Sequence, residues 1–184
     1  MKRAAFLDRD GVINRDVGYV HRWDEFEFLA GVFDAMRRLR AAGYHLVIVT
    51  NQSGLARGLF DEAQYGELTG RMLDELARQG IAVEAVYHCP HHPAGTVERW
   101  AMDCDCRKPA PGMILRAAAE HGLSLADSFM VGDKLSDIGA ARAAGVGRAF
   151  LVRSENPECP GDDKVAADGV FASLADCVDA LGRA

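Results

Sequence analysis

Two acidic residues stand two positions apart near the amino end of the chain, where a short apolar run stops. The run covers residues 4–7, and Asp8, Arg9, Asp10 and Gly11 follow it directly. Side chains at positions i and i+2 of an extended strand emerge on the same side, so both carboxylates can address one atom. Neighbouring carboxylates repel each other, and a bound cation relieves that repulsion. The stretch therefore predicts a cation-dependent reaction site at a strand end.

More polar side chains occur at the ends of other apolar runs. They are Thr50, Asn51, Gln52, Ser53, Arg107, Lys108, Asp133, Lys134 and Asp137. Each one alone has a plainer explanation, as a turn, a helix cap or a solvated charge. In an open α/β sheet, however, ligands bind beyond the carboxyl ends of the strands. Carboxylates, a hydroxyl and cations gathered at one such edge are the groups that phosphoryl transfer needs.

The chemistry of phosphate esters gives these residues separate tasks. The hard oxygen ligands of Asp8 and Asp133 suit Mg²⁺. A carboxylate that attacks phosphorus forms an aspartyl-phosphate and divides one difficult hydrolysis into two steps. A second acid two residues along can protonate the leaving alkoxide. The Lys108 ammonium and the Thr50 hydroxyl would steady the phosphoryl oxygens. These residues predict a Mg²⁺-dependent phosphatase.

The elements that must position this set alternate along the chain. Apolar runs at residues 3–8, 44–51, 83–89, 128–133 and 147–152 show little polar alternation, which is typical of parallel strands covered on both faces. Amphipathic segments at residues 31–43, 61–80, 111–122 and 136–145, and one from Ser173 onward, predict helices. This pattern predicts one doubly wound, three-layer α/β domain over residues 1–184. Residues 14–30 and 88–111 do not fit the alternation, and residues 154–164 have the composition of an exposed loop.

Composition limits the class of protein. The chain has 184 residues, of which 49% are hydrophobic and 26% charged, with a formal net charge of −6. A negative balance argues against nucleic acid as the main partner. No apolar run approaches the roughly 20 residues that span a bilayer, and the amino end is too short in apolar residues for a signal peptide. We therefore expect a cytoplasmic monomer that acts on a small molecule and binds no membrane.

A loop at about residues 88–108 carries three of the five cysteines. Cys89 and His91 form C-x-H, and twelve residues later Cys104 and Cys106 form C-x-C. Three thiolates and one imidazole suit a closed, structural zinc site, although His88 and His92 are also available as the imidazole ligand. The alternative is that these cysteines are small buried residues, but residues 90–103 are too polar to offer a core. Zinc would order this long loop and hold Arg107 and Lys108 in place.

Four segments resemble, in order, the motifs of the haloacid dehalogenase superfamily. They are FLDRDGVIN, VIVTNQSG, RKP and MVGDKLSD, within residues 6 to about 150. The resemblance implies the superfamily's fold, with Asp8 as nucleophile and Asp10 as general acid and base. The other roles that it implies are phosphoryl binding by Thr50, Arg107 and Lys108, Mg²⁺ binding by Asp8, Asp10 and Asp133, and support by Asp137. Acids at both positions of the first motif are the phosphatase form.

The Cys/His loop narrows this resemblance. CPHHP followed by CDCRKP is similar to the D-glycero-D-manno-heptose-1,7-bisphosphate 7-phosphatases and to the histidinol-phosphate phosphatase domains, in which such a loop stands in for a larger cap domain. We therefore expect a capless phosphatase that removes the 7-phosphate of a heptose bisphosphate, with histidinol phosphate or another small sugar phosphate as the alternative. A receiver-like phosphoacceptor domain is the non-enzyme alternative, and Asp10 argues against it.

The same resemblance implies the contacts that select the substrate. Residues 14–30 would form the loop that contacts the sugar. The implied substrate-binding residues are Asp16, Gly18, Tyr19, Asn51, Gln52, Ser53 and Lys134, with Arg57 facing the same pocket. Arg107 would recognise the second phosphate or the hydroxyls of a bisphosphate.

Overall fold

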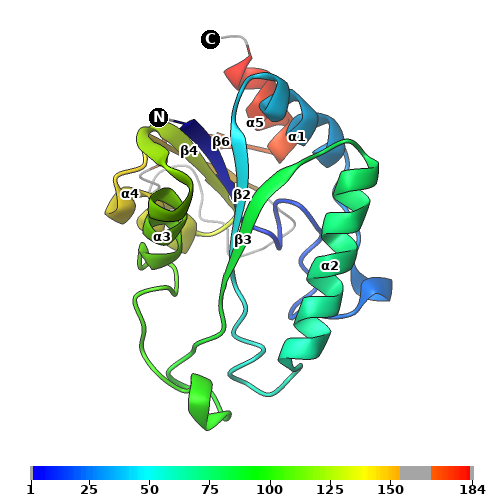
Figure 1. The fold of residues 1–184 in the computed structure, drawn as a ribbon, viewed down its shortest axis with the longest axis vertical. Helices are drawn as coiled ribbons and strands as arrows, with labels where there is room; N and C mark the ends of the chain where they lie inside the picture. Colours follow the sequence, from blue (N-terminus) through cyan, green and yellow to red (C-terminus); the bar gives the residue numbers. More distant parts are fainter. Residues whose placement is uncertain (1, 154–166, 183–184) are drawn as a thin grey trace.

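A single parallel sheet forms the centre of the computed structural model, which describes residues 2–153 and 167–182. Within these residues the strands are β1 (Lys2–Leu7), β2 (His45–Asn51), β3 (Val83–Cys89), β4 (Leu123–Gly132), β5 (Arg148–Val152) and β6 (Gly169–Phe171). Their order is β3-β2-β1-β4-β5-β6 (Figure 1). This is a doubly wound order, in which the direction of winding reverses between β1 and β4. Ligands are expected at the carboxyl ends of these two strands.

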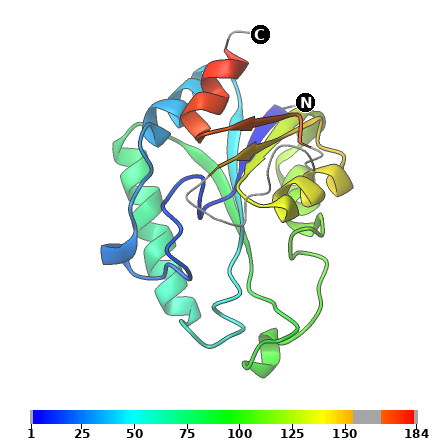
Figure 2. The ribbon, with the colours of Figure 1, turned by 180° about the vertical axis from the view of Figure 1, so that it is seen from behind.

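Helices cover both faces of the sheet. One face carries α1 (Val32–Ala41), α2 (Glu62–Arg78) and α5 (Leu174–Leu181), and the other carries α3 (Gly112–His121) and α4 (Leu135–Ala144) (Figures 1 and 2). Successive strand residues face opposite layers, so Leu7 packs with the first group of helices and Phe6 with the second. Burial on both faces explains the continuous apolar runs. The predicted three-layer α/β fold is confirmed.

The predicted elements match the structure closely, with two differences. α2 begins as predicted, because the Asp61 carboxylate accepts a bond from the Gln64 amide at 2.8 Å and Gln64 Oε1 accepts one from the Asp61 amide at 3.0 Å. β4 starts earlier, at Leu123, and β6 was not predicted because three residues are too few for a pattern. Residues 154–164, predicted as a loop, lie outside the described residues. Among the described helices, none is long and apolar enough to cross a membrane.

Two irregular segments stand next to the carboxyl ends of the strands. The N-terminal loop (residues 14–30) contains one short 3-10 helix, η1 (Trp23–Glu25), and lies alongside α2. The Cys/His loop (residues 88–108) contains another, η2 (Glu98–Trp100), and extends from the end of β3 (Figure 2). These are the two segments that did not fit the strand and helix alternation in the sequence.

Candidate active site

Three buried carboxylates meet where the strand order reverses. Asp8 follows β1, Asp133 follows β4, and Asp137 lies in the first turn of α4. One oxygen from each lies within 4.8 Å of the other two, and none of the three residues is more than 5% exposed. Buried like charges at this separation disfavour ionisation unless a cation accompanies them.

Lys108 supplies one positive charge to this cluster. Its Nζ lies 2.9 Å from Asp8 Oδ1 and 2.5 Å from Asp137 Oδ1, and it donates to the Val49 carbonyl oxygen at 2.8 Å. An ammonium has three protons, so all of them are used. Asn51 holds the Lys108 backbone from both sides, because Asn51 Oδ1 accepts from its amide at 3.0 Å and Asn51 Nδ2 donates to its carbonyl at 3.1 Å. The lysine is therefore fixed in place.

The pKa of Asp8 indicates that the charge of Lys108 does not fully compensate the buried carboxylates. Burial raises the pKa of Asp8, and the neighbouring charge of Asp137 raises it further, while Lys108 only partly opposes these effects. Burial alone would lower the pKa of Lys108, but the carboxylates of Asp137 and Asp8 outweigh it, so the pKa is raised and the ammonium stays charged. The three carboxylates beside Lys108 form an all-oxygen donor set that fits a divalent cation such as Mg²⁺.

Two glycines leave room for these carboxylates. Gly11 has φ +84°, and a Cβ there would lie 2.3 Å from Asp133 Oδ2. A Cβ on Gly132 would lie 2.3 Å from Asp137 Oδ2. Only glycine permits this close approach, and at Gly11 it also permits the left-handed turn after the first motif. The backbone is therefore shaped around the acidic cluster.

Asp10 has different surroundings from Asp8. Its side chain is 16% exposed and lines a depression of about 220 Å³. The other lining residues are Asp16, Gly18, Tyr19, Asn51, Gln52, Ser53, Gly54 and Lys134. Seven of these residues were predicted to bind substrate, but Arg57 and Arg107, which were also predicted to face it, are not among the lining residues. The structure thus places one acid of the first motif in a buried cluster and the other at an open depression.

Gln52 connects the phosphoryl-binding residues to the open side. Its Nε2 donates to the Thr50 hydroxyl at 2.9 Å and to Asp10 Oδ2 at 3.0 Å. Thr50 is 1% exposed and lies in β2, next to the strand that carries Asp8. Lys134, which also lines the depression, pairs with Asp16 at 3.1 Å. Its pKa is raised, because the carboxylates of Asp133, Asp16 and Asp8 outweigh the opposing effect of burial.

The carboxylate cluster differs from the predicted set of metal ligands in one residue. Asp137, predicted as a supporting residue, is part of the carboxylate cluster, whereas the Asp10 side chain is not among its three members. The first turn of α4 brings Asp137 back over Gly132. Asp133 and Asp137, which are four residues apart, therefore share one site. The role of Asp10 in Mg²⁺ binding stays a prediction, as does that of Arg107, whose Nη1 donates to the His91 carbonyl oxygen at 3.4 Å.

The four predicted ligands of the Cys/His loop come together. Cys106 Sγ lies 3.1 Å from Cys89 Sγ and 3.4 Å from Cys104 Sγ, and His91 Nδ1 lies 3.3 Å from Cys106 Sγ. These cysteines are free thiols. Burial raises the pKa of the Cys89 thiol, which a bound cation would reverse. The arrangement can hold a metal ion through three sulfur atoms and one nitrogen.

The structure also separates His91 from the other two candidate imidazoles. The His88 ring lies against the Tyr65 ring, with centroids 4.2 Å apart. His92 Nε2 lies 3.2 Å from Arg57 Nη2, and its Nδ1 accepts from a backbone amide. The path of the loop, which spacing alone does not define, therefore selects His91.

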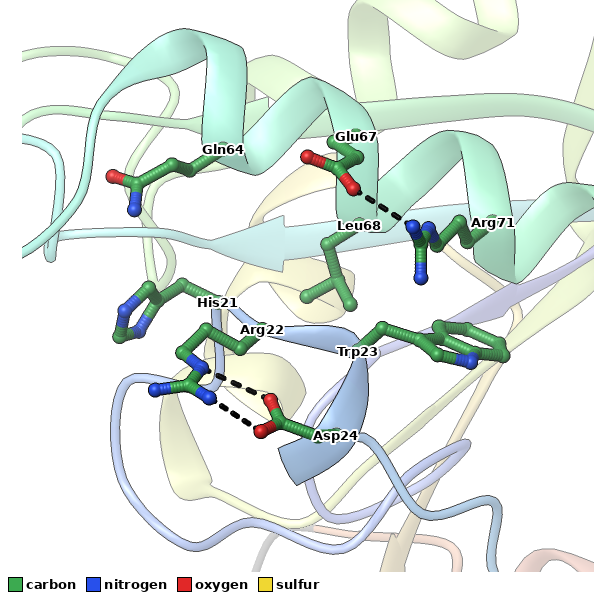
Figure 3. Close-up of a pocket in the computed structure, with 8 residues that line it drawn as sticks. All are labelled: His21, Arg22, Trp23, Asp24, Gln64, Glu67, Leu68 and Arg71. Carbon is green, nitrogen blue, oxygen red and sulfur yellow. Dashed lines mark hydrogen bonds and ion pairs between the residues drawn. The ribbon is translucent and has the colours of Figure 1, made fainter.

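A second and larger depression lies between the N-terminal loop and α2. It measures about 330 Å³ and is lined by His21, Arg22, Trp23, Asp24, Gln64, Glu67, Leu68 and Arg71 (Figure 3). Arg22 pairs with Asp24 and Arg71 with Glu67, so these charges compensate each other. No nucleophile and metal-binding acid converge among these eight residues, and we assign the reaction site to the smaller depression.

Comparison with known proteins shows the family to which the chain belongs. Residues 105–177 match the family model described as HAD-hydrolase-like. The D-glycero-beta-D-manno-heptose-1,7-bisphosphate 7-phosphatase of Escherichia coli strain K12 is 53% identical over 180 residues, which cover 98% of this chain and 94% of that protein. The enzyme of the same name from Yersinia pestis is 49% identical over 97% of this chain and 94% of that protein. The chain belongs to this phosphatase family, within the haloacid dehalogenase superfamily.

A solved structure extends the similarity to the whole fold. The D,D-heptose 1,7-bisphosphate phosphatase of B. bronchiseptica, complexed with magnesium and phosphate, has a TM-score of 0.82 and 37% identity. The match covers 100% of this chain and 99% of that one. The predicted membership of the haloacid dehalogenase superfamily and its fold are confirmed.

Two residues of the phosphatase site were missed in the sequence. Arg9 is 1% exposed and donates to Asp10, and Asn14 is 0% exposed and donates from Nδ2 to Asp10 Oδ1 at 2.9 Å. A charged residue between two acids has the appearance of a solvated side chain. The available signal was the apolar pair Val12-Ile13 after the motif, which indicates that the chain stays buried here.

Proposed function

We propose that the chain is a Mg²⁺-dependent phosphatase that removes the 7-phosphate of D-glycero-D-manno-heptose 1,7-bisphosphate, with the β anomer named in its relatives as the substrate. The observation that carries this proposal is that the two acids of the first motif lie in different surroundings. Asp8 stands in a buried, cationic and acidic cluster, while Asp10 stands at an open depression. A nucleophile and a proton donor must approach phosphorus and the leaving oxygen separately, and this arrangement allows it.

The reaction proceeds in two transfers. An Asp8 carboxylate oxygen bonds to phosphorus as the bond from phosphorus to the sugar oxygen breaks, and Asp10 gives its proton to that oxygen. Water then attacks the aspartyl-phosphate, Asp10 takes a proton from the water, and phosphate and the Asp8 carboxylate are released. The Thr50 hydroxyl would bind the phosphoryl oxygens in both transfers, and so would Lys108, by exchanging one of its carboxylate contacts for a phosphoryl oxygen.

Asp8, Asp133 and Asp137 provide the carboxylates that would hold Mg²⁺, and Asp10 is the further ligand implied by the family motif. The ion would offset the repulsion between the phosphate dianion and the attacking carboxylate. Asn51 fixes Lys108, and Gly11 and Gly132 leave space for the acids, so the backbone accommodates the donor set.

We also propose that Cys89, His91, Cys104 and Cys106 bind a structural zinc ion. The four side chains leave no position for a substrate in a tetrahedral shell, which is typical of structural sites. The peptide continues from Cys106 directly into Arg107 and Lys108. Zinc would therefore fix the entry of the chain into the active site, while taking no part in the reaction.

Arg107 would bind the phosphate that is not cleaved. It belongs to a group of cationic side chains at the edge of the Cys/His loop. The pKa of His92 is lowered by burial and by the nearby guanidinium groups of Arg107 and Arg57. Guanidinium groups suit the dianionic oxygens of a phosphate ester. A bisphosphate would then lie with one phosphate at Asp8 and the other at this group.

The decisive experiment compares wild type with Asp8→Asn under steady-state conditions. Wild type should release phosphate from the heptose bisphosphate with a higher kcat/KM than from histidinol phosphate, should lose this activity in EDTA, and should recover it with Mg²⁺. Asp8→Asn should lose activity by a factor on the order of 10³ or more. Asp74→Asn, an exposed carboxylate on α2, serves as the control and should remain active. Full activity of Asp8→Asn, or faster turnover of histidinol phosphate, would overturn the assignment.

A further inference from the structure

Arg9 is a charged side chain buried within the first motif. It lies between Asp8 and Asp10 in sequence, yet its side chain is only 1% exposed. Its Nε donates to Asp10 Oδ1 at 3.2 Å, and its Nη2 contacts both Asp10 oxygens at 2.9 Å. The pair is not sealed in the core, because the Asp10 carboxylate borders the depression that receives the substrate. The Arg9 guanidinium therefore contacts the Asp10 carboxylate from its buried side.

The Asp10 carboxylate is held on several sides. Asn14 donates to Oδ1 at 2.9 Å and Gln52 donates to Oδ2 at 3.0 Å, in addition to the Arg9 fork. A proton donor is efficient only when its oxygen lies within hydrogen-bonding reach of the leaving atom. Arg9 is the one of these three that contacts both oxygens, so it defines the plane of the carboxylate.

The same guanidinium also contacts the N-terminal loop. Nη2 donates to the Val20 carbonyl oxygen at 2.9 Å, and Val20 is 1% exposed. Val20 directly follows Gly18 and Tyr19, which line the depression together with Asp16. One planar group therefore ties the proton donor to the segment that faces the sugar. A lysine ammonium cannot make this set of contacts, because it lacks the rigid fork.

Burial of the Arg9 side chain costs free energy of folding. Among the described residues, its Nη1 has no hydrogen-bond partner although it is buried. An unsatisfied buried donor is destabilising, and a buried ion pair is in general weak evidence for stability. A cost of this kind beside a reacting carboxylate is typical of residues retained for function.

We infer that Arg9 is a positioning residue, which aims the Asp10 carboxylate at the leaving oxygen and couples its position to the sugar-facing loop. This inference rests on the proposed phosphatase function. It predicts a defect that depends on the leaving group. A sugar alkoxide must receive the Asp10 proton as the phosphorus–oxygen bond breaks, whereas p-nitrophenolate leaves without it. Misplacing Asp10 should therefore slow the first transfer only for the sugar substrate.

The test is a rapid-mixing experiment on Arg9→Met with Mg²⁺ and zinc present. The first turnover of the heptose bisphosphate should slow by about 100-fold, while the first release of p-nitrophenolate from p-nitrophenyl phosphate changes by less than about threefold. Hydrolysis of the aspartyl-phosphate also needs Asp10, so p-nitrophenolate should appear as a burst. Arg9→Lys keeps the charge without the fork and should show the same differential effect, smaller in size.

Arg37→Met removes an exposed guanidinium on α1 and should behave as wild type with both substrates. Equal slowing of the two substrates in an Arg9 variant would overturn the inference, because loss of folded protein affects both alike. Failure of both Arg9 variants to show a cooperative melting transition would assign Arg9 to folding and also overturn it. A wild-type protein that hydrolyses neither substrate would instead refute the phosphatase function itself.

Discussion

The N-terminal loop and the Cys/His loop both border the candidate active site, but they differ in the contacts that order them. Both are polar segments beside the carboxyl ends of the strands, and each contains one short 3-10 helix. The N-terminal loop places side chains of its own on the hydrophobic core, including Val20 and Phe26. The Cys/His loop places only its cysteines Cys89, Cys104 and Cys106 against the second core cluster, and these gather with His91 as side chains that could hold a metal ion. One loop is thus ordered by packing, whereas the proposed zinc ion would order the other by coordination.

The packing of the N-terminal loop consists of an aromatic group. The rings of Trp23 and Phe26 are stacked with centroids 5.6 Å apart, and Phe28 meets Phe26 edge to face at 5.0 Å. Phe28 also lies 4.7 Å from Phe33 in α1. Aromatic contacts of this kind contribute beyond the area that they bury. They continue the core of the domain into the loop without a metal.

The Cys/His loop has less packing to rely on. Away from the metal-binding side chains, Ala56 accepts backbone bonds from Thr96 at 2.8 Å and Val97 at 2.9 Å. Trp100 packs beside a small cluster formed by Leu55, Phe60 and Tyr65. The difference teaches that a capless phosphatase can order one wall of its site through the core, while the wall that carries Arg107 and Lys108 would depend on the proposed zinc ion.

The first way to break this comparison is to remove a metal ligand. Cys104→Ser should lose bound zinc and lower the free energy of unfolding by more than about 4 kcal/mol, because the ligands then remain unpaired and the loop loses its main constraint. Elemental analysis and urea unfolding measure the two effects. Cys177→Ser, at a buried cysteine outside the cluster, should keep its zinc. A full zinc content in Cys104→Ser would show that coordination does not order this loop.

The second way is to remove packing from the other loop. Phe26 is 8% exposed, and Phe26→Ala should lower the free energy of unfolding by about 3–4 kcal/mol. The zinc content should not change, while kcat/KM for the sugar substrate should fall, because Asp16, Gly18 and Tyr19 belong to the same loop. Urea unfolding, elemental analysis and steady-state assays measure these effects.

Val17→Ala is the matched control for the packing of this loop. Val17 is 58% exposed, so its truncation should cost less than about 0.5 kcal/mol. Loss of zinc in Phe26→Ala would show that the two loops are not independently ordered, and would remove the distinction between them.

The sequence predicts well those features that depend on local pattern. Asp8, Thr50 and Asp133 end apolar strands, so their convergence follows from the parallel sheet alone. Features that depend on the path of a loop were beyond its reach. The burial of Arg9 requires Val20 to return over it, and the choice of His91 requires the Cys/His loop to fold back. Both depend on contacts between residues whose spacing carries no period.

The smallest expected effect concerns a hydrogen bond at the base of the Cys/His loop. Tyr87 in β3 donates to Glu120 in α3 at 2.6 Å, and so joins the elements before and after the loop. Burial and the hydrogen bond to Glu120 raise the pKa of Tyr87 to about 12, against about 10 in an unfolded chain. The folded chain holds this proton more tightly. The stabilisation is therefore complete below about pH 10 and is lost as the pH rises through about 12.

Linkage gives a loss of about 1.4 kcal/mol at about pH 11 from this group. Urea unfolding of wild type and Tyr87→Phe at about pH 8 and about pH 11 isolates it, because all other titrating groups are shared. Wild type should lose more stability than the variant over this interval, with zinc content held constant. An equal loss in the two proteins would mean that the side-chain tie contributes nothing at the base of the loop. Coordination by Cys89, His91, Cys104 and Cys106 would then have to order the Cys/His loop without it.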